Sequence, residues 1–461
     1  MNFLEEKQKD LSCSVKNVLA ASLPMMASIF SGALMQFVDR ILLSHYSPMA
    51  LNYALLSQQI YNTLLLPLLC FASLSEVFVG QLNGAHQWKE TSAPTIQIAV
   101  FVCLVEILLA PILMSFRHQI LPSSMYEGTY PCLLLGLGTI PFQVMHASFA
   151  AFFVGTRRPK VILLSVIIGN IFNAFLNWVF IFGIPSVLEP MGALGAATGT
   201  LLGTLISLLV LASFFFNRKN NNFYNTRTFR MNKAILKKNI FLGAPYSFAI
   251  FVDMSMWVVV TNALAEVSSE EVRVNYVCLS IWTFAFFIVE GLQKGVTALA
   301  ANCIGARKEK NIPVLLKSVA KITLGIAALS YLYFQTFAPE ILKACFNIPV
   351  LTALPHCKET LFLQWIGFSV MSFSLGGLVG ILNAGGDTRF VTFLRLTCLL
   401  FSVIIPVLIL SSTGSMRTII SWGLSALNIC LICLLYVLRY ASGKWNHNVM
   451  KEAPQENLSD L

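Results

Sequence analysis

Apolar runs of about twenty residues recur along the whole chain, and they restrict the fold more than any other feature. The segment 96–116 is typical, with one charged residue, Glu106. A helix of about twenty apolar residues crosses the roughly 30 Å hydrocarbon core of a membrane. Of the 461 residues 56% are hydrophobic and 11% are charged, whereas soluble proteins carry about 25% charged residues. Because short segments of alternating hydrophobicity, typical of membrane barrels, are absent, we predict an all-α polytopic membrane protein.

The hydropathy pattern, with a mean hydropathy of +0.73, predicts twelve transmembrane helices. They are expected at 17–43, 52–79, 95–116, 131–154, 160–183, 193–216, 239–264, 274–301, 313–337, 361–384, 390–411 and 417–440.

The second half of the chain repeats the order of proline and glycine-containing motifs found in the first half. Pro24 and Pro245 lie 221 residues apart, and each is followed by an apolar run. The motif at 155–158 aligns with 386–389 at an offset of 231. Six spans in each half bring the chain back to the same side of the membrane, so the halves must be parallel repeats. We therefore predict two pseudo-symmetric six-helix lobes.

The longest hydrophilic loop, 217–238, separates the two lobes and contains seven basic residues and no acidic one. Its asparagine-rich stretch predicts a flexible cytoplasmic linker that could touch anionic lipid headgroups. No hydrophilic segment is long enough to bury a core of its own. The predicted organisation is an N-terminal tail at 1–16, an N-lobe at 17–216, the linker at 217–238, a C-lobe at 239–440 and a C-terminal tail at 441–461.

The net charge of +10 follows the predicted topology. Counted with the residues that flank each span, 21 of the 31 basic residues lie on the side of the two termini, and five lie on the other side. This asymmetry is the positive-inside rule, so both termini are expected in the cytoplasm of a multi-pass protein of the cell membrane. The excess of basic residues therefore indicates the topology and gives no reason to expect a nucleic-acid partner.

Motifs for ATP hydrolysis and for common enzyme chemistry are missing from the sequence. It contains no G-x-x-x-x-G-K-[ST] loop, no H-E-x-x-H helix and no G-x-S-x-G elbow. Cys430 and Cys433 have a metal-like spacing but lack a second pair or histidines, so we expect small packing residues and no metal there. The sequence predicts neither an enzyme nor a cofactor, and transport would be driven by an ion gradient.

Asp39 is an acidic residue inside the first predicted span, and ionisable residues in spans commonly face a cavity or a partner. A carboxylate there could bind a cation or exchange a proton. The alternative is a local ion pair with Arg40. Successive helical side chains point about 100° apart, so Arg40 can reach outward while Asp39 points inward, and we favour the functional interpretation.

The seventh and eighth spans contain further ionisable residues. Asp253 has no cationic neighbour in its own helix, which makes it a second candidate for proton or cation exchange. Glu290 and Lys294 have the i,i+4 spacing of an intrahelical ion pair, although both could still line a cavity.

The fifth span carries a stripe of asparagines, Asn170, Asn173 and Asn177, of which the last two share a helix face. Such a stripe can coordinate a cation or bind substrate, and it can equally join helices. The small residues that begin the sixth span permit close approach, and Thr198 or Thr200 could bond the asparagine face.

In this order, the motifs resemble the multidrug and toxic compound extrusion (MATE) family over about 17–440, and most closely its NorM-like branch. They are FVDRILLSHYSPMALNYA in the first span, GQLNGA, FNAFLNWVFIFG followed by GALGAATGT, GAPYSFAIFVD, and LVGILNAGGDTRF between the tenth and eleventh spans.

The resemblance implies roles for several residues. Asp39 matches the coupling carboxylate of the first lobe, and Asp253 matches a glutamate of the seventh span. Asn173, Asn177 and Thr200 match polar positions around the first-lobe cavity. The chain departs from the pattern at 361–384, where the branch has an aspartate and this sequence has no acid. Asn177 also stands where DinF-type members often have aspartate.

These departures leave the coupling ion open between H⁺ and Na⁺, with a sodium ion near Asp39 as one alternative. Glu290 remains a candidate outside the family pattern. We expect an ion-coupled efflux antiporter, active as a monomer among membrane lipids, whose substrates are small organic cations. The alternatives are a lipid-linked oligosaccharide flippase of the same superfamily and, from another class, a membrane-embedded enzyme.

Overall fold

The computed structural model describes residues 12–121, 123–228, 231–337 and 356–446, which are almost entirely helical. No β-strand occurs in these ranges, where a single bridge joins Ile184 to Leu188. The all-α prediction is confirmed.

The first half of the chain contains nine labelled helices and two 3₁₀ turns. The helices are α2 (Val15–Tyr46), α3 (Pro48–Ser73), α4 (Ser75–Gly84), α5 (Ser92–Ser115), α6 (Arg117–Ile120), α7 (Tyr126–Gly155), α8 (Pro159–Phe182), α9 (Ala193–Phe215) and α10 (Arg218–Tyr224), and the turns are η1 (Trp88–Glu90) and η2 (Ser123–Met125).

The second half includes three π-helical segments, η4 to η6. Its elements are α11 (Lys233–Ala265), α12 (Ser269–Gly305), η3 (Glu309–Asn311), α13 (Ile312–Leu332), η4 (Tyr333–Phe337), α15 (Cys357–Phe373), η5 (Ser374–Val379), α16 (Gly380–Ala384), α17 (Thr388–Leu399), η6 (Leu400–Ile404), α18 (Ile405–Ser412) and α19 (Thr418–Ala441).

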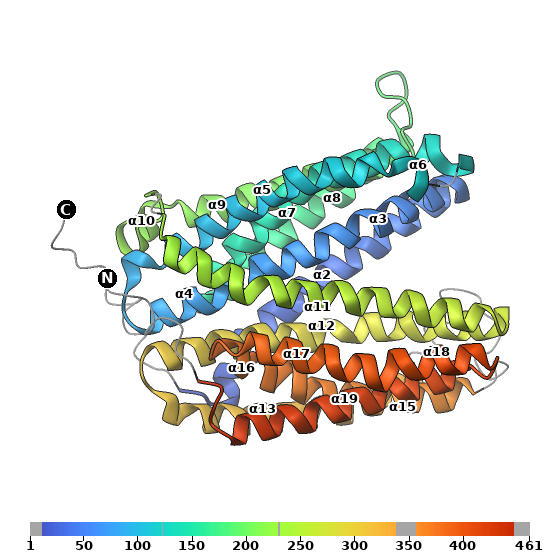
Figure 1. Ribbon diagram of the computed structural model, residues 1–461. Coiled ribbons are helices and arrows are strands. Elements are labelled where there is room, and N and C mark those ends of the chain that lie inside the picture. The colour runs from blue at the N-terminus through green and yellow to red at the C-terminus, as the bar shows by residue number, and fades with distance from the viewer. Residues whose placement is uncertain (1–11, 122, 229–230, 338–355, 447–461) are drawn as a thin grey trace. The chain divides into compact units, whose positions relative to one another are not determined.

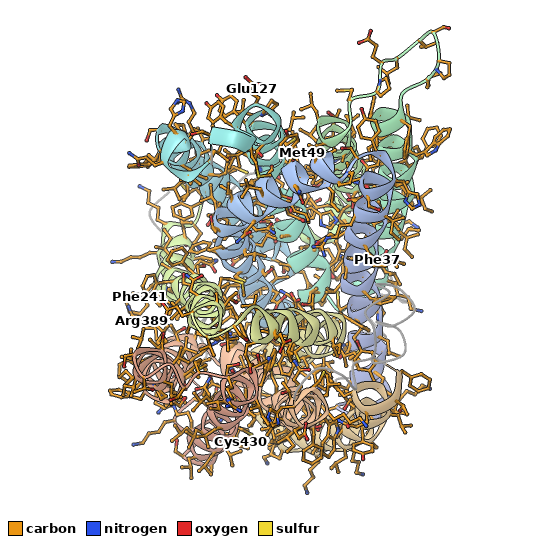
Figure 2. The ribbon with its side chains drawn as sticks, turned by 90° about the vertical axis from the view of Figure 1, so that its right-hand side faces the viewer. Phe37, Met49, Glu127, Phe241, Arg389 and Cys430 are labelled. Atoms are coloured by element: carbon orange, nitrogen blue, oxygen red, sulfur yellow. The ribbon has the colours of Figure 1, made fainter. Side chains whose placement is uncertain are left out.

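The described residues form twelve helical segments that are long and apolar enough to cross a membrane, as predicted. Some consist of consecutive elements, such as α3 and α4, which together cover Pro48–Gly84. Viewed along the helices, large apolar side chains project outward, including Phe241, which is 51% exposed (Figure 2). An apolar outer surface of this kind suits contact with lipid chains.

The chain folds into two compact units. The N-unit is Ala27–Ser247; the described part of the C-unit is 12–26 with 248–446. In the N-unit, α8 packs along α9 and α3 packs along α7; in the C-unit, α15 packs along α19 (Figure 1).

Two helices, α2 and α11, pass from one unit to the other. The chain crosses after Met26 and after Ser247, in each case two residues beyond a helix-interior proline, Pro24 or Pro245. The first part of α2 joins the hydrophobic core of the C-unit, and the first part of α11, with Ile240, packs on the core of the N-unit.

The compact units therefore differ from the lobes 17–216 and 239–440 expected from the sequence. The start of each lobe's first helix packs in the other unit, because its apolar side chains are buried there. Ser318 Oγ of α13 also donates a hydrogen bond to the Cys13 carbonyl at 2.7 Å, which fixes the beginning of α2 within the C-unit.

One tight turn ends five helices in the described residues: one copy follows α18 at Gly414 (φ 63°), and the other four locate the internal repeat. In each turn a residue with positive φ follows the helix: His86 (61°), Arg157 (61°), Arg307 (56°) and Gly386 (86°). The backbone amide of the residue after it donates a hydrogen bond to the carbonyl of the helix residue five positions earlier in the chain. Such bonding satisfies carbonyl groups that the helix end leaves open.

The turns correct one alignment made from the sequence. Residues 155–158 correspond to 384–387, at an offset of 229, and not to 386–389 at an offset of 231. The sequence alignment matched a glycine and an arginine by identity, whereas the repeated feature is the left-handed residue, Arg157 or Gly386.

The linker between the lobes contains a docked helix, α10, and the expected flexible linker is wrong for this part. Arg158 Nη1 donates to Asn220 Oδ1 at 2.7 Å, and its guanidinium lies 5.1 Å from the centre of the Tyr224 ring. Trp88 stacks on Phe223 at 4.5 Å. Burial lowers the pKa of the Arg158 guanidinium, and Tyr224 opposes this shift. Asparagines that look disordered in the sequence cap and anchor this helix.

Candidate ion-coupling site

Asp39 lies on the part of α2 that belongs to the N-unit, beside two asparagines of α8. Asn177 Nδ2 donates to Asp39 Oδ1 at 2.6 Å and to Asn173 Oδ1 at 2.9 Å. Because one amide group donates to two oxygens, it must be the nitrogen end of the Asn177 side chain. The structure thus joins three residues that the sequence singled out into one polar cluster.

Arg40 does not form an ion pair with Asp39, although the two are adjacent in the chain. The Arg40 side chain is exposed, while that of Asp39 is only partly exposed. Within the described residues, no cation lies within 4 Å of the Asp39 carboxylate. Arg40 acts on Asp39 only through a longer-range electrostatic attraction. The local ion pair considered from the sequence is therefore absent.

Close packing of α8 against α9 makes room for the asparagine side chains. Gly199 and Gly203 of α9 lie directly against Asn177 and Asn173: a Cβ at Gly203 would be 2.5 Å from the Asn173 Cβ, and one at Gly199 would overlap the Asn177 side-chain oxygen. Small residues at i,i+4 positions allow such an approach between membrane helices. The run GALGAATGT is thus a packing surface for the polar cluster.

Gly199→Ala should therefore disrupt the cluster without changing any polar group. We expect a strong loss of transport together with a loss of about 1–3 kcal/mol of stability from overpacking. Gly138→Ala in α7 is the matched control, because a Cβ there would have no atom within 4 Å. Transport activity and melting temperature of both variants would be measured side by side; equal behaviour of the two would contradict the packing role.

The Asn177 side-chain oxygen is fully buried and accepts no hydrogen bond from the described residues. Asn173 Nδ2 donates to the Gly199 carbonyl, with a long distance of 3.5 Å. Thr198 bonds the carbonyl of Leu194 in its own helix, and no hydrogen bond joins Thr200 to the asparagines in the described part of the chain. A backbone carbonyl of α9, and not one of the predicted threonine side chains, therefore bonds the asparagine face.

The third asparagine of the stripe has a different partner. Asn170 Nδ2 donates to Ser31 Oγ of α2 at 2.8 Å, so it ties α8 to α2 outside the Asp39 cluster. Sequence reasoning missed a second polar group in the N-unit, where His146 Nε2 lies 3.3 Å from Ser165 Oγ and 3.1 Å from Ser207 Oγ. A histidine within a predicted span was the signal available for it.

Asp253 of α11 forms an ion pair with Arg395 of α17, a residue that sequence reasoning missed. The two side chains are 11% and 25% exposed, respectively. The sequence treated Asp253 as a carboxylate with no cationic neighbour in its helix. The lysines of α11 all lie at its beginning, at least 15 residues before Asp253, and the partner comes from another helix. An arginine inside the apolar span predicted at 390–411 was the signal for this pair.

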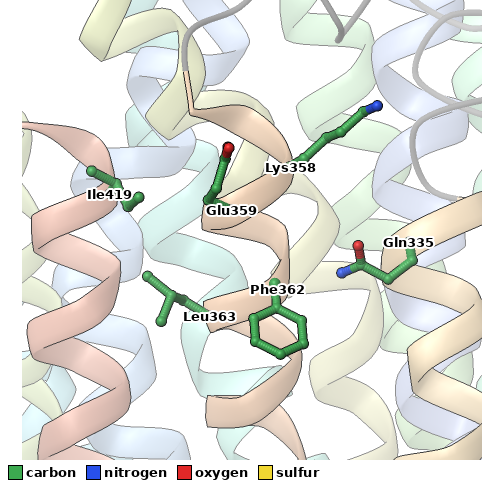
Figure 3. Close-up of a pocket in the computed structure, with 6 residues that line it drawn as sticks. All are labelled: Gln335, Lys358, Glu359, Phe362, Leu363 and Ile419. Carbon is green, nitrogen blue, oxygen red and sulfur yellow. The ribbon is translucent and has the colours of Figure 1, made fainter.

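Glu290 and Lys294 of α12 attract each other electrostatically, as their spacing predicts. The C-unit also has a cavity of about 440 Å³ near the beginning of α15 (Figure 3). Its lining includes Lys358 and Glu359 and none of the candidate residues, so the cavity adds nothing to the site.

The comparison with protein families decides the identity. The MatE family model matches residues 24–179 and 245–436, which together cover most of both halves of the chain, with α9 left outside the match. The chain belongs to the MatE family. Members of this family are transporters, so this MatE protein is a multi-pass membrane transporter and not an enzyme, as predicted.

Curated relatives of this MatE protein carry the name "Probable multidrug resistance protein NorM". The relative from Photorhabdus laumondii is 21% identical over 388 residues, covering 82% of this chain and 84% of its own. The relative from Mannheimia succiniciproducens is 22% identical over 344 residues, covering 71% of each chain.

Solved structures show the same fold. A transporter of the MOP superfamily from Pyrococcus furiosus superimposes with a TM-score of 0.80 at 17% identity, covering 94% of this chain and 96% of its own. The eukaryotic MATE transporter AtDTX14 gives a TM-score of 0.78 at 17% identity, with coverages of 95% and 97%. At these identities the similarity concerns the fold, and the predicted MATE-like architecture is confirmed.

Proposed function

We propose that this MatE protein is a multidrug efflux antiporter that exports small organic cations in exchange for an ion, with Asp39 as the coupling group. The names of the curated relatives support drug export. The observation that supports the coupling role is that Asp39 accepts a hydrogen bond from the amide of Asn177, which also bonds Asn173, and forms no ion pair within the described residues.

The charges of the C-unit support the same assignment. Asp253 is paired with Arg395, and Glu290 is attracted by Lys294, so each acid has a nearby cation. A carboxylate that already faces a cation gains less from binding a proton or a metal cation. Asp39 is therefore the acid best placed to change its occupancy during transport, and Asp253 takes a supporting role.

The coupling ion that best fits this cluster is H⁺. A sodium ion needs several oxygen ligands, whereas the amide of Asn177 presents its NH₂ group to Asp39. The Asn177 oxygen lies against Gly199 and accepts no hydrogen bond from the described residues. Protonation of Asp39 needs no additional ligand, and the segment 361–384 offers no acid for a second sodium site.

Asp39 can act on conformation because it lies on α2, the helix that leaves the C-unit after Met26. Any carboxyl group whose pKa differs by one unit between two conformations shifts their ratio tenfold, or about 1.4 kcal/mol. Proton binding would in this way select one state of an alternating-access cycle.

Transport into proteoliposomes with an imposed gradient tests the proposal. An acidic lumen should drive uptake of a fluorescent organic cation, and a proton ionophore should abolish it. A sodium gradient at equal pH on both sides should drive none. Uptake under the sodium gradient alone would assign the coupling to Na⁺, and no uptake under either gradient would contradict ion-coupled antiport.

A flippase for lipid-linked oligosaccharides is less well supported. Holding a pyrophosphate needs uncompensated cations, whereas Lys294 and Arg395 each lie beside an acid.

We propose that the antiporter works as a monomer in the cell membrane. Both termini are assigned to the cytoplasm, because the basic residues concentrate on that side.

A further inference from the structure

The long helix α12 carries two cysteines, Cys278 and Cys303, near opposite faces of the membrane. The helix is continuous from Ser269 to Gly305. Cys303 follows Cys278 by 25 positions, which is a rise of roughly 37 Å at 1.5 Å per residue. Since the hydrocarbon core is about 30 Å thick, the two thiols belong to opposite interfaces.

Each of these cysteines contacts a second thiol within the C-unit. The Sγ atoms of Cys303 and Cys13 lie 3.6 Å apart. The Cys278 thiol hydrogen-bonds with that of Cys357, the first residue of α15, and both belong to one buried hydrophobic cluster. None of these four cysteines is in a disulfide bond in the structure, and each is at most 3% exposed.

The charges beside α12 assign a compartment to each pair. Arg307, Lys308 and Lys310 follow Cys303, which places that end in the cytoplasm by the positive-inside rule. The other end begins with Glu270 and Glu271. This orientation rests on the topology given with the proposed function. The cytoplasm keeps thiols reduced, whereas disulfides form on the outer side of a cell membrane.

We propose that Cys278 and Cys357 form a disulfide bond in the mature protein, while Cys13 and Cys303 remain thiols. The oxidant is an extracytoplasmic thiol–disulfide oxidase that acts on the chain before these residues are buried. One thiolate attacks the disulfide of the oxidase, and the second displaces the oxidase from the mixed disulfide. Two electrons and two protons pass to the oxidase, which leaves as a dithiol.

The bond would fix the first turn of α15 to α12 at the outer end of the C-unit. Gln364 of α15 already donates to the Cys278 carbonyl at 2.9 Å, so the two helices are in register there. The cross-link closes a loop of nearly eighty residues, and long loops lose much freedom in the unfolded chain when closed. It would keep α12 and α15 together while the transporter changes state.

Thiol mapping of the full-length protein in native membranes tests this proposal without a transport assay. Membranes would be acid-quenched, denatured, alkylated without reductant and analysed by mass spectrometry. The expected result is a linked pair of peptides containing Cys278 and Cys357, with Cys13 and Cys303 alkylated. Cys278→Ser and Cys357→Ser should lower the melting temperature equally under non-reducing conditions, and Cys13→Ser should not reproduce the effect of reductant on the wild type.

Three results would overturn the proposal. They are complete alkylation of Cys278 and Cys357 before reduction, a bond from either one to Cys345, and a bond between Cys13 and Cys303 instead. The last result would also reverse the topology. If the linked peptides are found but the wild-type protein shows no ion-coupled transport in proteoliposomes, the antiporter proposal is contradicted and the disulfide proposal stands.

Discussion

Asp39→Asn should abolish coupled export while the protein still folds and inserts. Asparagine keeps the size of the side chain and an oxygen that can accept the 2.6 Å hydrogen bond from Asn177, but it cannot ionise. The variant therefore imitates the protonated state permanently. Export of an organic cation in proteoliposomes should be lost, and the melting temperature should remain near that of the wild type.

The same variant should lose the response of conformation to pH. Distances across the outer ends of the helices, measured by spin labels between about pH 5 and 8, should change in the wild type and stay constant in Asp39→Asn. Arg40→Gln is the matched control, since Arg40 is the exposed neighbour of Asp39 and forms no ion pair with it in the described residues. A wild-type pH response in Asp39→Asn would place the switch elsewhere.

The fold could be predicted because hydrophobicity in a membrane is a strong and local signal. Apolar runs near twenty residues gave twelve spans, and the structure has twelve candidate spans. Asn173 and Asn177 could be assigned to one face since helical spacing alone determines it. The contact of Asn177 with Asp39 was beyond this reasoning, because it depends on how α2 packs against α8.

Features that depend on packing between distant segments were predicted less well. Arg395 lies 142 residues from Asp253, and no spacing rule connects them. The asparagines of 217–228 are typical of a flexible linker by composition, yet Arg158 and Trp88 provide partners that hold α10 in place. The helices α2 and α11 each begin in one unit and continue in the other, because of where their apolar faces are buried. The periodicity within one helix cannot predict this.

The ion pair of Asp253 with Arg395 changes what a neutral substitution should do. Without a cationic partner, Asp253→Asn would leave folding largely intact, because the amide keeps the size of the side chain. With Arg395 as partner, the same change leaves a largely buried guanidinium without its counter-charge. Removing one member of a buried pair costs roughly 3 kcal/mol, the low end of the known range, which fits a site where Arg395 is still 25% exposed.

Asp253→Asn and Arg395→Gln should therefore each lower the melting temperature, and the double variant should recover most of the loss, because no charge then remains unpaired. A thermal-unfolding double-mutant cycle in detergent measures this coupling. Lys317→Gln supplies the control for loss of a basic residue outside the pair. Additive losses in the double variant would show that the two charges do not stabilise each other.

Transport by the double variant then separates the two carboxylates. If Asp253 only neutralises Arg395, the double variant should export an organic cation with its proton dependence retained, since Asp39 is untouched. A folded double variant that no longer couples export to protons would instead return Asp253 to the coupling mechanism. The two acids thus differ in a testable way: replacing Asp39 cannot be compensated by removing any neighbouring cation, because none lies within ion-pair distance in the described residues.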